Sequence, residues 1–300
     1  MLISIILPTY NRAELLEIAI KSVIEQTYKN WELIIVDNNS TDKTDEIIDK
    51  YKNDKIHVLK INNNGSIAKS RNKGILYARG KFIAFLDSDD SWHKDKLSIC
   101  TDYLIKNPNF GVCHSETWKY TNATRKNIIK NYGPEGNFTF EKLLERGNCL
   151  SLSAVIIPKK FIEKVGLFNE DIELITAEDY ELWIRIARGN LKIKFIEKNL
   201  GVFKVHDASE SSDIERNSNA IEYIINKYSK YGINDRKCKS SLWLNTGKQY
   251  HLIGEYLKAL KYYVKSSIGG RTLLSQILHI IALLIPLSII QMLHHRKNSQ

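Results

Sequence analysis

The chain has 300 residues, of which 43% are hydrophobic, and it carries a formal net charge of +10. This length and composition predict a globular protein with one large core, or one core and a smaller helical part. The cysteines form no Cys-x-x-Cys pair and have no matching histidine spacing, which argues against a zinc site or a disulfide framework and favours a reducing cytoplasm.

The excess of positive charge calls for an anionic partner, which could be nucleic acid, an acidic membrane surface or a phosphorylated ligand. Lys and Arg are dispersed among Asp and Glu through the first two hundred residues, without a basic helix that carries interleaved aromatic residues. We therefore expect no nucleic-acid partner. Residues 1–8 have no basic leader and too short an apolar run for a signal peptide, so we expect catalysis inside the cell.

The first ninety residues alternate between strand-like and helix-like patterns. Strands are predicted at residues 3–7, 31–36, 56–59 and 81–86. Between them, the spacing predicts an amphipathic helix at 15–24, a helix that Ser40 or Thr41 caps and that runs to residue 51, and a helix at 67–78. This alternation predicts an α/β fold with a mostly parallel, Rossmann-like sheet that helices cover on both faces.

The remainder of the chain continues the sheet and then becomes helical. We expect helices at 94–106, 139–146, 159–165 and 178–188, and strands at 110–120, 154–157, 192–196 and 201–206. From residue 213 onward only helical patterns occur. We therefore expect a domain at 1–209, a helical region at 210–270, and a final segment at 271–300.

The final segment contains a run at 272–293 without formal charge, if His279 is neutral, followed by a basic tail. The run is long enough to span a bilayer, but polar residues dilute it. Basic residues flank it on both sides, so the positive-inside rule favours both flanks facing the cytoplasm. This favours an interfacial or re-entrant element over a span or a core helix, with an anionic membrane surface as partner.

An apolar run at 82–86 changes abruptly into Asp87, Ser88, Asp89 and Asp90. A buried strand would deliver these carboxylates to the carboxyl end of the sheet, where open α/β folds bind ligands. Carboxylates there can hold Mg²⁺ together with substrate phosphates. Taken alone, acidic residues after a strand more often cap a helix or shape a turn.

Four further stretches accompany the acidic one, at residues 8–12, 36–42, 65–74 and 177–180. Each has a simpler explanation, since they could be a turn, an Asx-turn, packing glycines and favourable charges at a helix start. The motifs in order are Pro-Thr-Tyr-Asn-Arg at 8–12, Gln-Thr-Tyr at 26–28, Trp-Glu-Leu-Ile-Ile-Val-Asp at 31–37, Ser-Thr-Asp at 40–42, Arg-Asn-Lys-Gly at 71–74, Ala-Arg-Gly at 78–80, Leu-Asp-Ser-Asp-Asp at 86–90 and Glu-Asp-Tyr-Glu-Leu-Trp at 178–183. In this order they resemble family 2 glycosyltransferases of the GT-A fold, over roughly residues 1–206.

The resemblance implies an inverting enzyme that uses a nucleotide-sugar and a divalent metal, Mg²⁺ or Mn²⁺. It implies Asp179 as the catalytic base and Asp87 to Asp89 as the Asp-x-Asp motif. The residues expected at the nucleotide are Pro8, Thr9, Tyr10, Asp37, Arg71 and Asp87, those expected at the metal are Asp89 and His206, and weaker candidates are Glu178, Ser88, Asp90 and Trp92.

Elementary chemistry suits these roles. The carboxylate of Asp37 can accept the ring N–H of uracil, which favours a UDP donor. Arg71 can donate two hydrogen bonds to phosphate or pair with acidic residues of the pocket, and Asp89 can hold the cation against the diphosphate. A sugar hydroxyl needs a general base, for which Glu178 competes with Asp179, although neighbours on a helix point about 100° apart.

Two further candidates, His206 and Trp92, have weaker support in the sequence. His206 stands where the family often has an Arg-x-His sequence, but Lys204 replaces the arginine, which puts a bidentate phosphate contact in doubt. Trp92 follows the acidic residues directly, so it is the tryptophan most suited to the donor site, although a tryptophan is more often core.

We therefore expect a hexosyltransferase-type enzyme, peripheral on the inner face of the cell membrane, that adds one sugar to a glycan or lipid-linked acceptor in cell-surface polysaccharide synthesis. The chain has no Gln-x-x-Arg-Trp motif of the processive synthases. One alternative is a nucleotidyltransferase, which would normally show a glycine-rich loop after its first strand. Another is a non-catalytic, membrane-associated protein that binds nucleotide-sugars or glycans.

Overall fold

The computed structural model describes residues 1–121, 126–133, 136, 138–205 and 213–268. The chain divides into two compact units. The first comprises Met1–Phe140, Cys149–Ile172 and Glu178–Asp207, and the second comprises Glu141–Asn148, Glu173–Ala177 and Ala208–Gln300. The division at residues 209 and 270 that the sequence suggests stays a prediction.

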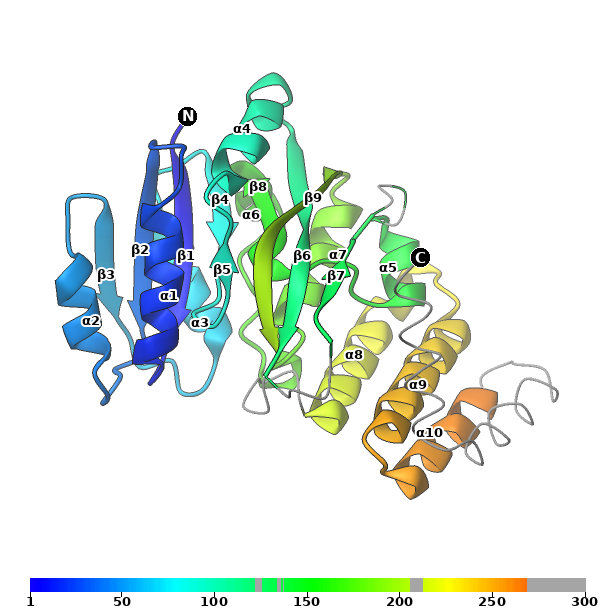
Figure 1. The fold of residues 1–300 in the computed structure, drawn as a ribbon. Coiled ribbons are helices and arrows are strands. Elements are labelled where there is room, and N and C mark those ends of the chain that lie inside the picture. The colour runs from blue at the N-terminus through cyan, green and yellow to red at the C-terminus, as the bar shows by residue number, and fades with distance from the viewer. Residues whose placement is uncertain (122–125, 134–135, 137, 206–212, 269–300) are drawn as a thin grey trace. The chain divides into compact units, whose positions relative to one another are not determined.

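The first unit is built on a nine-stranded mixed sheet in the order β3-β2-β1-β4-β8-β6-β9-β5, with β7 paired to β6 (Figure 1). The strands are β1 (Ile3–Thr9), β2 (Trp31–Asp37), β3 (Ile56–Lys60), β4 (Phe82–Phe85), β5 (Ser91–Trp92), β6 (Phe110–Tyr120), β7 (Ile128–Lys130), β8 (Val155–Pro158) and β9 (Lys192–Val205). The strands from β3 to β4 are parallel, whereas β8 is antiparallel to both β4 and β6. The α/β fold class expected from the sequence is confirmed.

The parallel register brings the carboxyl ends of three strands to one edge of the sheet. Thr9 at the end of β1 pairs with Asp37 at the end of β2. Phe85 of β4 pairs with Ile6 of β1, and the amide of Leu86 donates to the Ile6 carbonyl. The residues that follow β4 therefore leave the sheet at the same edge as Thr9 and Asp37.

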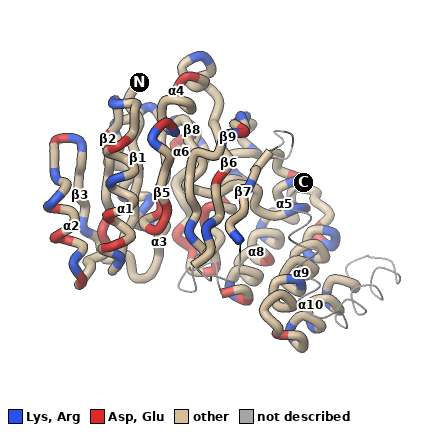
Figure 2. Tube along the Cα trace, viewed as in Figure 1, with Lys and Arg blue, Asp and Glu red and all other residues tan. Residues whose placement is uncertain are grey.

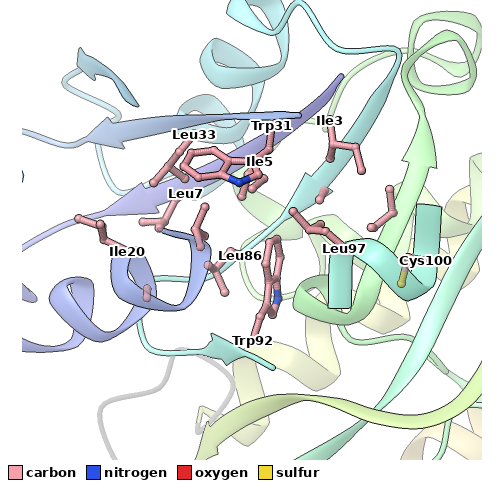
Figure 3. Packing of buried hydrophobic residues seen from close by; sticks show 14 of the residues in the cluster. Ile3, Ile5, Leu7, Ile20, Trp31, Leu33, Leu86, Trp92, Leu97 and Cys100 are labelled. Carbon is pink, nitrogen blue, oxygen red and sulfur yellow. The ribbon is translucent and has the colours of Figure 1, made fainter. Parts of the chain in front are cut away.

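Helices cover both faces of the parallel strands. The helices of the first unit are α1 (Ala13–Ile24), α2 (Thr44–Tyr51), α3 (Ile67–Tyr77), α4 (Lys96–Lys106), α6 (Lys159–Val165) and α7 (Glu178–Arg188), with a 3₁₀ helix η2 (Leu152–Ala154). Alternate residues of β1 and β2 pack with α1 and α4 in one cluster, in which Trp31 and Trp92 lie among aliphatic side chains (Figure 3). The opposite face packs tightly on α3, because a Cβ added to Gly74 would lie 2.6 Å from Cγ2 of Ile6.

Three strands differ from the sequence expectation. The runs at 192–196 and 201–206 belong to the single strand β9, which ends at Val205 among the described residues. The strands β5 and β7 were not expected from the sequence pattern. The polar residues between the two runs remain in the strand because β9 pairs with β6 along its whole length, with register shifts at Ser115. Pairing to a long neighbour therefore overrides the local preference for a turn.

The second unit is helical over its described part. Its helices are α8 (Ile214–Tyr228), α9 (Asp235–Leu252) and α10 (Tyr256–Ile268), and the 3₁₀ helix η5 (Ser229–Tyr231) follows α8. The helix α5 (Phe140–Arg146) and the 3₁₀ helix η3 (Ile172–Leu174) each begin one residue before a segment of this unit. The side chains of Asp213 and Asn234 cap α8 and α9 by accepting from backbone amides. Among the described helices, none is long and apolar enough to cross a membrane. The run at 272–293 lies outside the described residues.

Basic and acidic residues are interspersed over most of the described chain (Figure 2). Over most of the described residues Lys and Arg lie together with Asp and Glu, whereas α3 and α10 carry basic residues without acidic ones. The expectation of no nucleic-acid partner stays a prediction.

Candidate active site

The acidic residues form a tight turn directly after β4. The amide of Asp90 donates to the carbonyl of Asp87 over 3.0 Å, which closes the turn. Asp87 and Asp89 are half-buried, whereas Ser88 and Asp90 are buried. The strand therefore delivers its carboxylates to the edge of the sheet, as expected from the sequence pattern.

Arg71 connects the acidic turn to a helix that lies more than one hundred residues later in the chain. Its side chain is buried on α3, donates to Oδ1 of Asp87 over 2.8 Å and also donates to Oε1 of Glu178 on α7. Burial alone would lower the pKa of Arg71, but the charges of Asp87 and Glu178 raise it above its usual value. The guanidinium is therefore a fixed positive charge that joins the turn to the start of α7.

Asp179 lies beside this ion-pair network, in the first turn of α7. Burial and then the negative charge of Glu178 raise the pKa of Asp179 to about 7, against the opposing charge of Arg71. A general base works best when its pKa is close to the working pH. Asp179 is therefore suited to accept a proton near neutrality, while Glu178 is engaged by Arg71.

Asp89 faces a different arginine. Its Oδ2 accepts a hydrogen bond from Nη1 of Arg12, at the start of α1. Sequence reasoning placed Arg12 within a motif but not in the site, and the contact across 77 positions of the chain has no local signal. The two half-buried carboxylates of the turn thus each have an arginine partner, Asp87 with Arg71 and Asp89 with Arg12.

The described part of the chain contains no group of three or more His, Cys, Asp or Glu side chains that could hold a metal ion by themselves. The turn nevertheless suits a cation that a diphosphate would share, because Mg²⁺ commonly takes one or two carboxylates and completes its shell with phosphates and water. Burial and then the charges of Asp89, Glu116 and Asp87 raise the pKa of Asp90 well above its usual value. The charged form of Asp90 is therefore disfavoured, which leaves Asp87 and Asp89 as the carboxylates of the turn that suit a cation.

The residues expected at the nucleotide lie at the ends of β1 and β2. Asp37 is fully buried, accepts from the amide and hydroxyl of Ser40, and accepts from Nζ of Lys60 over 2.6 Å. Thr9 is buried beside it in register, and Tyr10 is 53% exposed. Pro8 precedes them within β1. The structure therefore places these candidates together at the carboxyl edge, and Lys60 is a neighbour that sequence reasoning missed.

The weaker candidates occupy interior positions. The ring of Trp92 lies in the hydrophobic core, and its Nε1 donates to the carbonyl of Ser153 over 2.9 Å (Figure 3). Asp90 accepts from the hydroxyl of Ser153 over 2.6 Å and from the amide of Lys204 over 3.0 Å. His206 lies outside the described residues. The roles assigned to these residues stay predictions.

Known proteins share both the sequence pattern and the fold. Residues 4–161 match the model of glycosyl transferase family 2. The chain is 31% identical over 227 residues to the UDP-Glc:alpha-D-GlcNAc-diphosphoundecaprenol beta-1,3-glucosyltransferase WfaP of Escherichia coli, which covers 74% of this chain and 86% of WfaP.

Among solved structures, S. aureus TarS 1–349 in complex with UDP-GlcNAc has a TM-score of 0.61 at 19% identity, covering 89% of this chain and 82% of that one. The mannosyltransferase PcManGT from Pyrobaculum calidifontis, in complex with GDP-Man and Mn²⁺, has a TM-score of 0.62 at 18% identity, covering 94% of this chain and 79% of that one. The chain spans half the length of the longer TarS chain. At these identities the structures show the fold alone.

The family match extends over more than half of the chain and includes β1, the acidic turn and α3. This chain therefore belongs to glycosyl transferase family 2, and the resemblance seen in its motifs is confirmed. It is a glycosyltransferase with a GT-A-type fold.

Proposed function

We propose that this glycosyltransferase moves one hexose from a UDP-sugar to a hydroxyl of a lipid-linked glycan, with inversion at the anomeric carbon and with the help of Mg²⁺ or Mn²⁺. The observation that carries the proposal is the buried Arg71, which pairs with Asp87 of the acidic turn and with Glu178 of α7. This pairing supports a shared site for the turn and for Asp179, in which a donor at the turn lies within reach of the base.

The donor is proposed to be a UDP-sugar because Asp37 at the carboxyl edge can accept the ring N–H of uracil. The relative WfaP uses UDP-Glc by its name, which supports the same nucleotide here. Thr9 lies in register with Asp37, and the exposed ring of Tyr10 follows it, so these residues would line the nucleoside. The burial of Thr9 and Asp37 and their pairing in register favour a preformed nucleotide site.

The metal would be held by Asp89, with Asp87 nearby and with His206 as the candidate that lies outside the described residues. When bound, a divalent cation neutralises the charge that develops on the departing diphosphate. Arg12 pairs with Asp89 in this structure, so the guanidinium would exchange partners, from the carboxylate to a phosphate oxygen, when the donor binds. Arg71 remains paired and keeps Asp87 oriented.

Asp179 is proposed to accept the proton of the acceptor hydroxyl as that oxygen attacks the anomeric carbon. The bond to the diphosphate breaks on the opposite side of the carbon, which inverts its configuration in a single displacement. A positioned general base contributes about 10²- to 10⁴-fold to the rate. Because burial and Glu178 raise the pKa of Asp179 to about 7, about half of the side chains are in the accepting form at neutral pH.

The acceptor is proposed to be a lipid diphosphate-linked sugar, as the name of WfaP states for that enzyme. The apolar run at 272–293 and the basic tail that follows it would bring the protein to the anionic inner face of the membrane. The absence of the processive motif from the sequence supports the transfer of a single sugar.

The test is a screen of UDP-sugars with the purified full chain, Mn²⁺ and a synthetic GlcNAc-diphospholipid acceptor, with UDP release and product mass as the readouts. We expect transfer from one UDP-hexose, loss of transfer with EDTA and its return with added Mn²⁺. Asp89→Ala should lose transfer, whereas Asp49→Asn, which changes an exposed carboxylate on α2, should retain it.

Equal rates for Asp89→Ala and the parent would contradict the assigned metal chemistry. Binding of UDP by the parent without transfer to any acceptor would favour the non-catalytic alternative instead.

A further inference from the structure

We propose that Ser153 is a positioning residue that fixes the acidic turn in the geometry needed to bind the metal and the diphosphate. This inference rests on the proposed function of that turn, and it gives a role to Asp90 that differs from metal binding. Ser153 lies on η2, directly before β8, and is 63 positions away from Asp90 in the sequence.

The hydroxyl of Ser153 contacts both ends of the turn. Its Oγ accepts a hydrogen bond from the amide of Asp87 over 3.1 Å and donates one to Oδ2 of Asp90 over 2.6 Å. Ser153 is 1% exposed, so no water competes for these two bonds. One hydroxyl therefore sets the position of the first and the last residue of the turn, between which Ser88 and Asp89 lie.

The backbone of Ser153 is itself held in place by two buried donors. Its carbonyl accepts from Nε1 of Trp92 and from Nζ of Lys96, each over 2.9 Å. The ammonium of Lys96 also lies 3.2 Å from the ring centre of Trp92, and the side chain is fully buried. Ser153 is thus anchored to β5 and α4, the two elements that follow the turn in the chain.

The side chain of Asp90 also holds the acidic turn in place. Its Oδ1 accepts from the backbone amide of Lys204 over 3.0 Å, while its Oδ2 accepts from Ser153. Both oxygens are therefore occupied by protein donors, and the side chain ties the turn to the end of β9. Asp90 orients the turn, which leaves the half-buried Asp87 and Asp89 as the carboxylates that meet the ligand.

Loss of the Ser153 hydroxyl would release the Asp87 amide and one oxygen of Asp90 together, while the carbonyl contacts with Trp92 and Lys96 remain. Groups that orient metal ligands in this indirect way typically change metal affinity by about 10- to 100-fold when removed. We expect a loss of that size for the Mn²⁺–UDP pair, with a smaller effect on the proton transfer at Asp179, which Ser153 does not contact.

The experiment compares Ser153→Ala with Ser22→Ala in the full chain. Ser22 is a matched buried serine on α1, whose hydroxyl donates to the Ala19 carbonyl away from the turn. Calorimetric titration of UDP in the presence of MnCl₂ measures affinity, and hydrogen exchange measures protection of the Asp87 amide. We expect Ser153→Ala alone to weaken binding about 10- to 100-fold and to lose that protection, with KM for the donor raised more than kcat is lowered.

Similar affinity and exchange in Ser153→Ala and Ser22→Ala, with the parent binding UDP, would overturn this inference and leave the proposed function intact. A parent protein that binds no UDP with Mn²⁺ would overturn both. If Ser153→Ala does not fold, Asp90→Asn provides the same comparison, because it keeps an oxygen for Lys204 and removes one acceptor for Ser153.

Discussion

The two units differ in what they bury. In the described part of the first unit the buried charged side chains are Glu32, Asp37, Arg71, Asp90, Lys96, Glu116, Glu178 and Glu181. In the described part of the second unit the buried polar side chains are Ser218, Ser240, Thr246, His251 and Ser266. Burial lowers the pKa of His251, which keeps this ring neutral.

The buried polar groups of the second unit stabilise the fold, whereas several buried charges of the first unit lie where they could take part in binding and catalysis. Hydroxyls in the second unit are satisfied by nearby groups, as when Ser240 donates to the Ser266 carbonyl and Thr246 to the Leu242 carbonyl. A buried charge is far more costly than a buried hydroxyl unless it is paired. In the first unit Asp37 bears this cost at the carboxyl end of β2, and Asp90 bears it in the acidic turn, where a charged ligand would use it. Glu32, near the amino end of β2, is instead paired with Arg79.

Replacing Asp179 by Asn gives the sharpest test of the chemical use of a buried charge. We expect kcat to fall by about 10²- to 10⁴-fold, because the amide cannot accept the proton of the acceptor hydroxyl. The free energy of unfolding should not fall, since the variant removes a carboxylate that burial disfavours. Initial rates and urea unfolding measure the two effects. A rate within a factor of ten of the parent would assign the base to another group.

Replacing Arg71 by Met removes the central cation of the first unit. Asp87 and Glu178 would then face each other without a counter-charge, which should lower the free energy of unfolding by about 3–5 kcal/mol. Arg216→Met, at an exposed arginine of α8, should change it by less than about 0.5 kcal/mol. Urea unfolding measures the free energy of unfolding of both variants. Equal losses in the two would mean that the buried ion pairs of Arg71 contribute no more to stability than an exposed arginine does.

The pH dependence of transfer should reflect the raised pKa of Asp179. Since burial and Glu178 raise that pKa to about 7, the accepting form is lost below this pH. We expect kcat/KM to fall about tenfold for each pH unit below about 7. The free energy of unfolding changes in the opposite direction, because the folded state binds this proton more tightly than the unfolded chain. The contribution of Asp179 to stability therefore declines as the pH rises from about 4 to about 7. An unchanged profile in Asp179→Asn would contradict the assignment.

Lys96 provides a buried cation whose own titration can be followed. Burial lowers the pKa of Lys96 to about 7, although nearby acidic groups oppose the shift. Between about pH 7 and 10 the unfolded chain binds this proton more than the folded state does, so stability should rise with pH in that window. Lys96→Met should remove this part of the slope, measured by urea unfolding at several pH values. Parallel slopes in parent and variant would show that the ammonium is not desolvated.

Ser240→Ala should produce the smallest effect and applies to the second unit. The variant loses the buried bond to the Ser266 carbonyl, which should cost about 1 kcal/mol of unfolding free energy. Transfer should be unaffected, because no charged group takes part. A large loss of activity with this small loss of stability would show that the second unit takes part in the chemistry.

Much of the fold could be predicted from local patterns. The strand at 110–120 and the helix at 178–188 have the predicted bounds, because their apolar periodicity is regular and turn residues bound them. β5 could not be predicted, since two residues, Ser91 and Trp92, carry no periodicity. The sequence pattern predicts two strands where the structure has the single strand β9, because the pairing with β6 that holds β9 together is a long-range contact.

The sequence motifs predict which residues lie at the candidate site, but they predict few of the contacts between those residues. Asp37 ends a strand of a recognisable α/β pattern, and Asp87 and Asp89 follow another, so their common edge follows from the parallel arrangement. The pairing of Arg71 with Glu178 and the support of Asp90 by Ser153 join segments that no local pattern connects.

The sequence by itself determined the family, the alternation of strands and helices, and the edge at which the acidic residues lie, because these depend on residue types at short spacing. Only the tertiary structure decided which carboxylate has which partner. Electric charge acts through space, so the pKa of Asp179 and the roles of Arg12, Lys96 and Ser153 depend on distances between segments that are remote along the chain.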